Sequence, residues 1–496
     1  MLNLITNASK NLHAVAIVSN QREVSYQQLL NDSQVIATHL LGQSRDLAEN
    51  RIAFMVDPSY EYVAVQWGIW RAGGIAVPLC TAHPLPSLAY VLEDTQASKL
   101  IVAKEYAEML WESAEKYDIE LLHLEDVMQF EEEKKLPEVD TDRVAMILYT
   151  SGTTSKPKGV VITHANIEFQ AATLSEAWGW QSTDYILNVL PLHHVHGIVN
   201  ILTCALWNGA TCEFLPKFDA ETVWNKFLEG KINVFMAVPT IYNRLITYWE
   251  EADQEAKAQL SASLTPFRLM VSGSAALPVP VLEKWKAISG HTLLERYGMT
   301  EIGMALSNPY EGERRPGHVG QALPKVHIRL QKEDGTLATG EESGEIQIKG
   351  PNVFKEYWKK PAATQSAFTA DGWFKSGDIA QLNQGAYRIL GRNSVDIIKS
   401  GGYKISALEI EDKLRQHESI VACAVVGIPD ENWGEAVAVG VVLREGQQLA
   451  LKAMRTWAKE HLPAYKIPSK LLVLKELPRN TLGKVTKKEL KKLFIA

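Results

Sequence analysis

Short apolar runs alternate with longer helical patterns through the first third of the chain, and this alternation restricts the fold more than any other feature. Runs that predict buried strands occupy residues 51–56, 73–79, 99–103 and 144–150, and a helical pattern follows Ser59. A buried strand, a helix and a second buried strand form the βαβ unit of parallel sheets. The sequence therefore predicts an α/β fold built on largely parallel sheets.

The pattern changes further along the chain, which predicts additional parts of the fold. After about residue 320, short alternating strands are separated by Gly, Pro and Asp, a pattern that favours β-hairpins. A charged turn and a pair of glycines then mark a place where the backbone changes direction at low cost. We expect a large N-terminal domain over residues 1–395, with a β-rich subdomain at about 320–395, and a small mobile α+β domain over residues 396–496.

Charge and cysteine content exclude several classes of protein. The 51 basic and 58 acidic side chains give a net charge of −7, which argues against a nucleic-acid-binding protein or a polybasic membrane binder. The sequence contains no export signal and no run of about 18 apolar residues. We therefore expect a cytoplasmic monomer or homodimer without integral membrane association. No CxxC pair occurs among the cysteines, which predicts neither a disulfide framework nor a thiolate zinc site; they are Cys80, Cys204, Cys212 and Cys423.

A polar segment directly after the predicted strand at 144–150 is a candidate phosphate-binding loop. Small residues let backbone amides approach an anion, hydroxyls donate hydrogen bonds and lysines add positive charge. The order of residues differs from the P-loop of NTPases. Taken alone, such a segment is more often an ordinary polar turn. Its candidate residues are Thr150, Ser151, Gly152, Thr153, Thr154 and Lys158.

Five further motifs follow this loop in a fixed order. They are RYGMTE (296–301), SGD (376–378), GR (391–392), IIKSGGYKISALEIE (397–411) and PRNTLGKV (478–485). With YTSGTTSKPKG, they resemble the signature of the adenylate-forming enzymes, the superfamily of acyl-CoA synthetases, luciferases and peptide-synthetase adenylation domains. The resemblance covers nearly the whole chain. One departure is Ser155, where the family usually has glycine.

The resemblance implies a two-step reaction that uses ATP, Mg²⁺ and coenzyme A. The carboxylate of an acid attacks the α-phosphorus of ATP and expels pyrophosphate, and a thiol then attacks the acyl-adenylate and releases AMP. The family roles carry over onto the RYGMTE, SGD and GR motifs: Thr300 touches the α-phosphate, Glu301 holds Mg²⁺, Tyr297 and its neighbour Gly298 lie at the adenine, and Asp378 and Arg392 lie at the ribose.

The C-terminal motifs imply a moving domain. Lys484 matches the lysine that bridges the substrate carboxylate and the α-phosphate during adenylation. Because this lysine has to leave before the thiol arrives, the family swings its small domain between the two steps. We expect the pivot at or next to Asp396, and Gly401 and Gly402 leave room for the pantetheine arm. The residues that bind the CoA nucleotide stay unassigned.

Two polar segments and one arginine indicate the acid. The segment LPLHHVHG contains His193, His194 and His196, and LMVSGSAA contains Ser274, whereas a fatty-acid tunnel is apolar. A metal at the histidines is not favoured, because no cysteine or carboxylate nearby in the sequence completes a ligand set. Arg296 can meet a second carboxylate with two hydrogen bonds. The alternative is a surface pair between Arg296 and its neighbour Glu295.

These segments, together with LLERYGMTE and SNPYEG, most resemble the malonyl-CoA synthetases, including the group that also accepts methylmalonate. The resemblance implies that Arg296, Ser274 and either His194 or His196 hold the distal carboxylate. Two alternatives stay open: a ligase for a short, medium-chain or aromatic monocarboxylic acid, and an adenylation enzyme that loads a carrier protein.

Overall fold

Two large sheets form the body of the protein. The computed structural model describes the chain except residues 1, 130–133, 151–156, 394, 401–402, 431–432, 480–484 and 496. The first sheet has the order β15 (Gln321–Ala322), β14 (Gly303–Ser307), β13 (Leu294–Met299), β12 (Leu269–Ser272), β11 (Val234–Ala237), β9 (Tyr185–Asn188), β10 (Thr211–Phe214), β1 (Val15–Ser19) and β2 (Arg22–Ser25). Its strands from β13 to β1 are parallel.

The second large sheet contains the strands that the sequence predicts. Its order is β18 (Glu356–Tyr357), β8 (Lys158–Thr163), β7 (Val144–Thr150), β4 (Ile75–Pro78), β3 (Arg51–Met55), β5 (Lys99–Val102) and β6 (Glu120–His123). Strands β7 to β6 are parallel, while β8 returns antiparallel beside β7. The prediction of an α/β fold with largely parallel sheets is therefore confirmed.

One helix shows how the core is built. Helix α3 (Tyr60–Arg71) begins where the hydroxyl of Ser59 accepts a hydrogen bond from the amide of Tyr62 at 3.4 Å. Nearly every side chain of α3 is buried, as expected for a helix that is covered on all sides. Trp70 is 1% exposed, and its indole donates to the carbonyl of Ala145 at 2.7 Å. This hydrogen bond links α3 to β7, the strand that precedes the candidate phosphate loop in the sequence.

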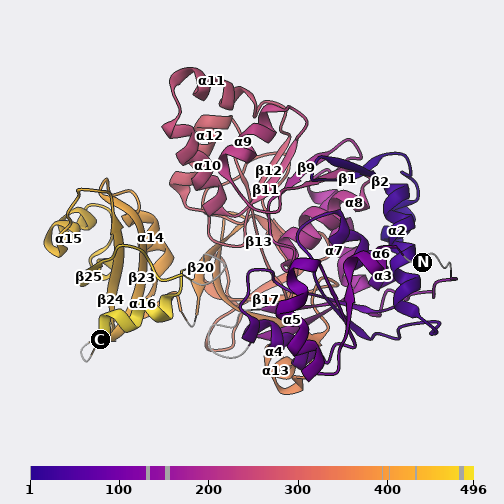
Figure 1. The fold of residues 1–496 in the computed structure, drawn as a ribbon. Coiled ribbons are helices and arrows are strands. Elements are labelled where there is room, and N and C mark those ends of the chain that lie inside the picture. The colour runs from indigo at the N-terminus through magenta and orange to yellow at the C-terminus, as the bar shows by residue number, and fades with distance from the viewer. Residues whose placement is uncertain are drawn as a thin grey trace.

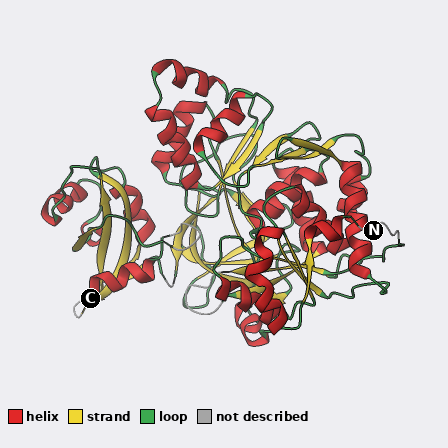
Figure 2. Cartoon of the chain, viewed as in Figure 1, coloured by secondary structure: helices red, strands yellow, loops and turns green. Residues whose placement is uncertain are grey.

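The remaining helices cover the sheets and are visible in Figures 1 and 2. The longer ones are α2 (Tyr26–Leu41), α4 (Leu85–Thr95), α5 (Lys104–Lys116), α7 (His164–Ala177), α9 (Ala220–Leu228), α10 (Pro239–Glu251), α11 (Gln254–Ala262) and α12 (Val279–Ser289). Shorter ones are α1 (Asn3–Ala8), α6 (Leu124–Met128), α8 (Cys204–Trp207), α13 (Pro361–Ala367), a π-helix at His196–Thr203 and a 3-10 helix at Ala464–Lys466. None of the described helices is long and apolar enough to cross a membrane.

A small antiparallel sheet follows, as the hairpin pattern predicts. Its order is β16 (His327–Gln331), β17 (Ser343–Lys349), β19 (Phe374–Asn383) and β20 (Ala386–Arg392). Asp378 of β19 lies opposite Arg392 of β20 in this sheet. The sheet therefore places the SGD and GR motifs side by side.

The last hundred residues form an α+β part with its own apolar clusters. Its strands are β21 (Ile397–Ser400), β22 (Tyr403–Ser406), β23 (Ile420–Asp430), β24 (Gly434–Leu443) and β25 (Lys470–Val473), and its helices are α14 (Ala407–Leu414), α15 (Leu451–Lys459) and α16 (Lys487–Ile495). Figure 1 shows this part to one side of the body, next to β20. We keep the boundary between residues 395 and 396 as a proposal.

Candidate active site

Tyr297, Asp378 and Arg392 meet where β13 faces the small antiparallel sheet. The hydroxyl of Tyr297 donates to one carboxylate oxygen of Asp378 at 2.6 Å, and Nε of Arg392 donates to the other at 3.1 Å. Burial raises the pKa of Tyr297, and the Asp378 charge adds to this effect, so Tyr297 stays a donor. A carboxylate held in this way can accept hydrogen bonds from the vicinal hydroxyls of a ribose. The structure thus brings together three residues that the motifs predict.

Gly298 lies at a close approach of two backbone segments. A β-carbon on Gly298 would lie 2.0 Å from the carbonyl oxygen of Gly303. This distance leaves no room for a side chain where β13 turns into β14. The glycine therefore allows the tight hairpin that presents Thr300 and Glu301 at its tip.

Glu301 lies in a buried site close to the start of β8. It is 6% exposed, and its carboxylate accepts a hydrogen bond from the hydroxyl of Tyr357 at 2.9 Å. The ammonium of Lys158 lies 4.7 Å from the centre of the Tyr357 ring. Burial raises the pKa of Glu301, although Tyr357 and nearby cations oppose the shift. Mg²⁺ is commonly bound by one carboxylate together with the phosphate oxygens of a nucleotide, and Glu301 can supply that carboxylate.

Tyr357 is a site residue that the sequence analysis missed. It lies outside the six motifs, and its strand β18 reaches the site only by pairing with β8. At the other end of the candidate loop, Thr150 ends β7 opposite Lys158. The remaining predicted loop residues Ser151, Gly152, Thr153 and Thr154 lie outside the described residues, as do Gly401, Gly402 and Lys484.

Arg296 is a buried cation without an acidic partner among the described residues. It is 3% exposed, and burial lowers its pKa to about 9. Its Nη2 donates to the hydroxyl of Ser274 at 3.4 Å, and this hydroxyl lies 3.2 Å from Nδ1 of His196. A β-carbon on Gly273 would lie 2.5 Å from Cζ of Arg296, so the glycine makes room for the guanidinium. A buried charge of this kind is costly unless a ligand pairs with it.

The backbone of Ser274 supports a functional role for this cluster. Ser274 has a φ of 67°, in the left-handed region that serine rarely adopts. Such a conformation costs about 1–3 kcal/mol and occurs preferentially at functional sites. It holds the hydroxyl between Arg296 and His196. The ring of His194 lies against that of His193, with 4.2 Å between ring centres, whereas His196 is the histidine that contacts Ser274.

The alternative of a surface pair between Arg296 and Glu295 is wrong. Both residues are buried, and successive side chains of a strand point to opposite faces. Glu295 accepts a hydrogen bond from the amide of Leu277 at 3.2 Å instead. Burial raises the pKa of Glu295 to about 8, against the opposing effect of that amide. Burial therefore favours the protonated form of Glu295, which does not balance the charge of Arg296.

The raised pKa of Glu295 predicts a pH-dependent stability. Between the ordinary glutamate pKa of about 4.3 and the raised pKa of about 8, the unfolded chain releases the proton while the folded chain keeps it. The free energy of unfolding then falls as pH rises, by about 1.4 kcal/mol per pH unit. We expect Glu295→Gln to remove this decline and to be more stable than the parent at about pH 8. Urea unfolding across the pH range, with the exposed Glu313→Gln as control, measures the effect, and parallel curves for both variants would contradict it.

Cys80 and His83 are brought next to His193, which overturns one expectation from the sequence. Their ligand atoms and that of His193 all lie within 4.8 Å of one another. The sequence suggested that no cysteine completes a ligand set near the histidines, because Cys80 is far away along the chain. Strand β4 delivers Cys80 from the second sheet, and only the tertiary fold shows this.

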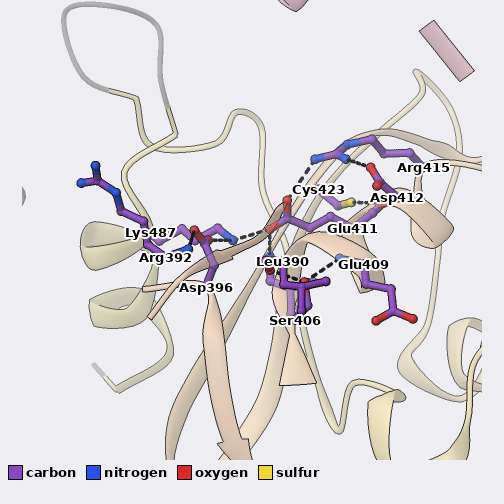
Figure 3. Close-up of polar contacts among 11 residues, drawn as sticks. Leu390, Arg392, Asp396, Ser406, Glu409, Glu411, Asp412, Arg415, Cys423 and Lys487 are labelled. Carbon is purple, nitrogen blue, oxygen red and sulfur yellow. Dashed lines mark hydrogen bonds and ion pairs between the residues drawn. The ribbon is translucent and has the colours of Figure 1, made fainter. Parts of the chain in front are cut away.

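Asp396 joins the body to the C-terminal part through contacts that no motif reveals. Lys487 Nζ donates to Asp396 at 2.5 Å and forms an ion pair with Glu411 at 2.7 Å. The amide of Arg392 also donates to the Asp396 side chain, at 3.0 Å. Figure 3 shows Lys487 between the two carboxylates, while the guanidinium of Arg392 extends away from them. In this arrangement α16, α14 and the end of β20 all meet at Asp396.

A ribose-type site, a buried carboxylate near Tyr357 and the start of β8, and a C-terminal α+β part are together typical of an adenylate-forming enzyme. Comparison with known proteins supports this assignment to the adenylate-forming enzymes. The sequence profile of the AMP-binding enzyme family matches residues 4–358, and that of the AMP-binding enzyme C-terminal domain matches residues 409–484. The chain belongs to the AMP-binding enzyme family.

Individual relatives show which members of the family the chain resembles. The mitochondrial malonate–CoA ligase ACSF3 of Xenopus laevis is 47% identical over 96% of this chain and 89% of its own. The malonate–CoA ligase of Arabidopsis thaliana is 41% identical over 98% of this chain and 87% of its own. The crystal structure of ATP-bound MatB from Rhodopseudomonas palustris has a TM-score of 0.92 at 32% identity and covers 99% of both chains. The resemblance to malonyl-CoA synthetases is therefore confirmed.

Proposed function

We propose that this protein is an ATP-dependent malonate–CoA ligase that forms AMP. The observation that carries the proposal is Arg296, a buried guanidinium without an acidic partner among the described residues, beside Ser274 and His196. A second carboxylate on the substrate satisfies this charge. The malonate–CoA ligases among the relatives support the same substrate.

In the first step, one carboxylate of malonate attacks the α-phosphorus of ATP, and pyrophosphate leaves. Thr300 and Lys158 flank the phosphates, Asp378 and Arg392 hold the ribose, and Glu301 holds Mg²⁺. Mg²⁺ held at Glu301 would supply positive charge for the phosphate oxygens. In the second step, the thiol sulfur of coenzyme A attacks the acyl carbon, the thiol loses its proton, and AMP leaves with its electron pair.

Lys484 acts in the first step alone under this proposal. We expect Lys484→Ala to lower the rate of adenylation by about 100-fold, because removing one positioned donor to developing charge has an effect of that order. Thioester formation from supplied malonyl-AMP and CoA should be nearly unchanged. Single-turnover assays of each step measure this, and an equal loss in both steps contradicts the role.

Pyrophosphate release with a panel of acids tests the substrate. We expect malonate to exceed acetate, octanoate and benzoate by about 10⁴-fold in kcat/KM, because a monocarboxylate leaves the buried polar groups unpaired. Methylmalonate is the second candidate, since it keeps both carboxylates. Comparable rates with octanoate or benzoate contradict a dicarboxylate pocket. Release of pyrophosphate without CoA-dependent thioester formation contradicts a CoA ligase and favours an enzyme that loads a carrier protein.

Location and assembly stay predictions. We keep the expectation of a cytoplasmic monomer or homodimer that does not bind nucleic acid. The relative from Xenopus laevis is described as mitochondrial, which is a statement about that protein. Fractionation of the native cells and light scattering of the purified protein test the two predictions.

A further inference from the structure

Two loops from different sheets meet at Cys80, His83 and His193. Cys80 lies just beyond β4 of the second sheet, and His83 lies before α4 in the same loop. His193 lies between β9 of the first sheet and the π-helix that begins at His196. One ligand atom from each of the three residues lies within 4.8 Å of the other two.

One polar atom of the cluster lacks the hydrogen bond that a buried polar group usually makes. Nε2 of His193 is buried and has no hydrogen-bond partner in the described part of the chain. An unsatisfied buried polar group costs about 1–3 kcal/mol, so its persistence calls for an occupant. The rings of His83 and His193 are 5.7 Å apart between their centres, and Cys80 is 5% exposed. The unsatisfied nitrogen therefore belongs to a ring that lies close to both a buried thiol and a second imidazole.

The type of donor decides which occupant fits. Sulfur and imidazole nitrogen are the ligands of Zn²⁺, whereas Mg²⁺ takes oxygen ligands. A neutral imidazole binds a metal ion through a ring nitrogen that carries a lone pair, and two such rings lie in the cluster. A coordinating thiol gives up its proton when it binds a cation of this kind.

We propose that Cys80, His83 and His193 form a Zn²⁺ site, distinct from the Mg²⁺ position at Glu301. Three protein ligands leave the fourth tetrahedral position open. The ion links the carboxyl ends of β4 and β9. It thereby fixes the segment from His193 to His196, whose last residue contacts Ser274 at 3.2 Å. The site is independent of which acid the enzyme activates.

Binding of Co²⁺ to the metal-free full chain tests the site directly. We expect one Co²⁺ per chain, with intense near-ultraviolet absorption from a thiolate–cobalt bond and stoichiometric displacement by Zn²⁺. Cys80→Ser should abolish this absorption. Because even indirect partners of a metal change affinity by about 10–100-fold, His83→Ala and His193→Ala should each weaken binding by more than about 100-fold.

Matched variants and an experiment on the parent protein complete the test. Cys204→Ser and His318→Gln replace residues outside the cluster and should bind Co²⁺ like the parent. Absence of the thiolate absorption in the parent, or full binding in Cys80→Ser, overturns the proposal. If the cluster variants do not fold, alkylation of the parent decides: Zn²⁺ should protect Cys80 from iodoacetamide, as mapped by mass spectrometry, and unchanged alkylation refutes the site.

Discussion

Arg296→Met should lower kcat/KM for malonate by about 10⁴-fold and leave the low activity with acetate nearly unchanged. The guanidinium is buried beside Ser274, and no described acidic side chain contacts it. The distal carboxylate of malonate can pair with this guanidinium through two parallel hydrogen bonds, and such a bidentate ion pair is strong. In the variant the carboxylate enters a pocket that offers a thioether instead of a cation. Steady-state pyrophosphate release with both acids measures the change.

The stability of the same variant separates a binding role from a structural one. An unpaired buried charge destabilises the free protein, so Arg296→Met should unfold at the same temperature as the parent or a higher one. Malonate should then stabilise the parent more than the variant. Arg296→Lys keeps the positive charge but loses the planar guanidinium that can donate two parallel hydrogen bonds. Its activity with malonate should lie between that of the parent and that of Arg296→Met. A parallel loss with acetate, or a clear loss of stability without ligand, contradicts the proposed role.

The parts of the site that the sequence predicts are those carried by continuous motifs. Asp378 and Arg392 fall within short motifs, and antiparallel pairing of neighbouring strands places them opposite each other. The apolar runs around residues 51–56 and 144–150 predict strands because buried parallel strands are apolar on both faces. The sequence alone is therefore sufficient to predict a site where the residues that contact one another lie close together in the chain.

Contacts between distant segments escape this reasoning. Tyr357 reaches Glu301 because β18 pairs with β8, and its sequence neighbourhood carries no motif. Cys80 reaches His193 because two different sheets end at the same place. Glu295 looks like a surface partner for Arg296, yet it is buried, and burial favours its protonated form. Such relations depend on register and burial, which a single sequence does not reveal.

Lys487→Met should destabilise the C-terminal part by about 3–5 kcal/mol, because it removes the cation from a buried ion-pair cluster. Lys487 is 9% exposed and contacts both Asp396 and Glu411. Burial alone lowers the pKa of Lys487, but the two carboxylates outweigh it and raise the pKa above its ordinary value. The resulting stability is fully present at neutral pH and is lost only as pH rises through the raised pKa. Hydrogen exchange of the amides in β23 and β24 measures the loss.

The neighbouring lysine provides a matched control for this change. Lys488 is exposed, and Lys488→Met should alter stability by no more than about 0.5 kcal/mol. Adding Glu411→Gln to Lys487→Met removes one of the two carboxylates that have lost this cation and should recover part of the loss. The recovery should be only partial, because Arg415 still pairs with Glu411 at 3.0 Å in Lys487→Met. If both lysine variants exchange alike, Lys487 does not hold Asp396.

Loss of the Lys487 contacts should also affect the reaction, because Asp396 is the proposed pivot. A loosened cluster should change how often the small domain leaves the conformation seen here. The ratio of the adenylation rate to the rate of thioester formation should therefore shift in Lys487→Met and not in Lys488→Met.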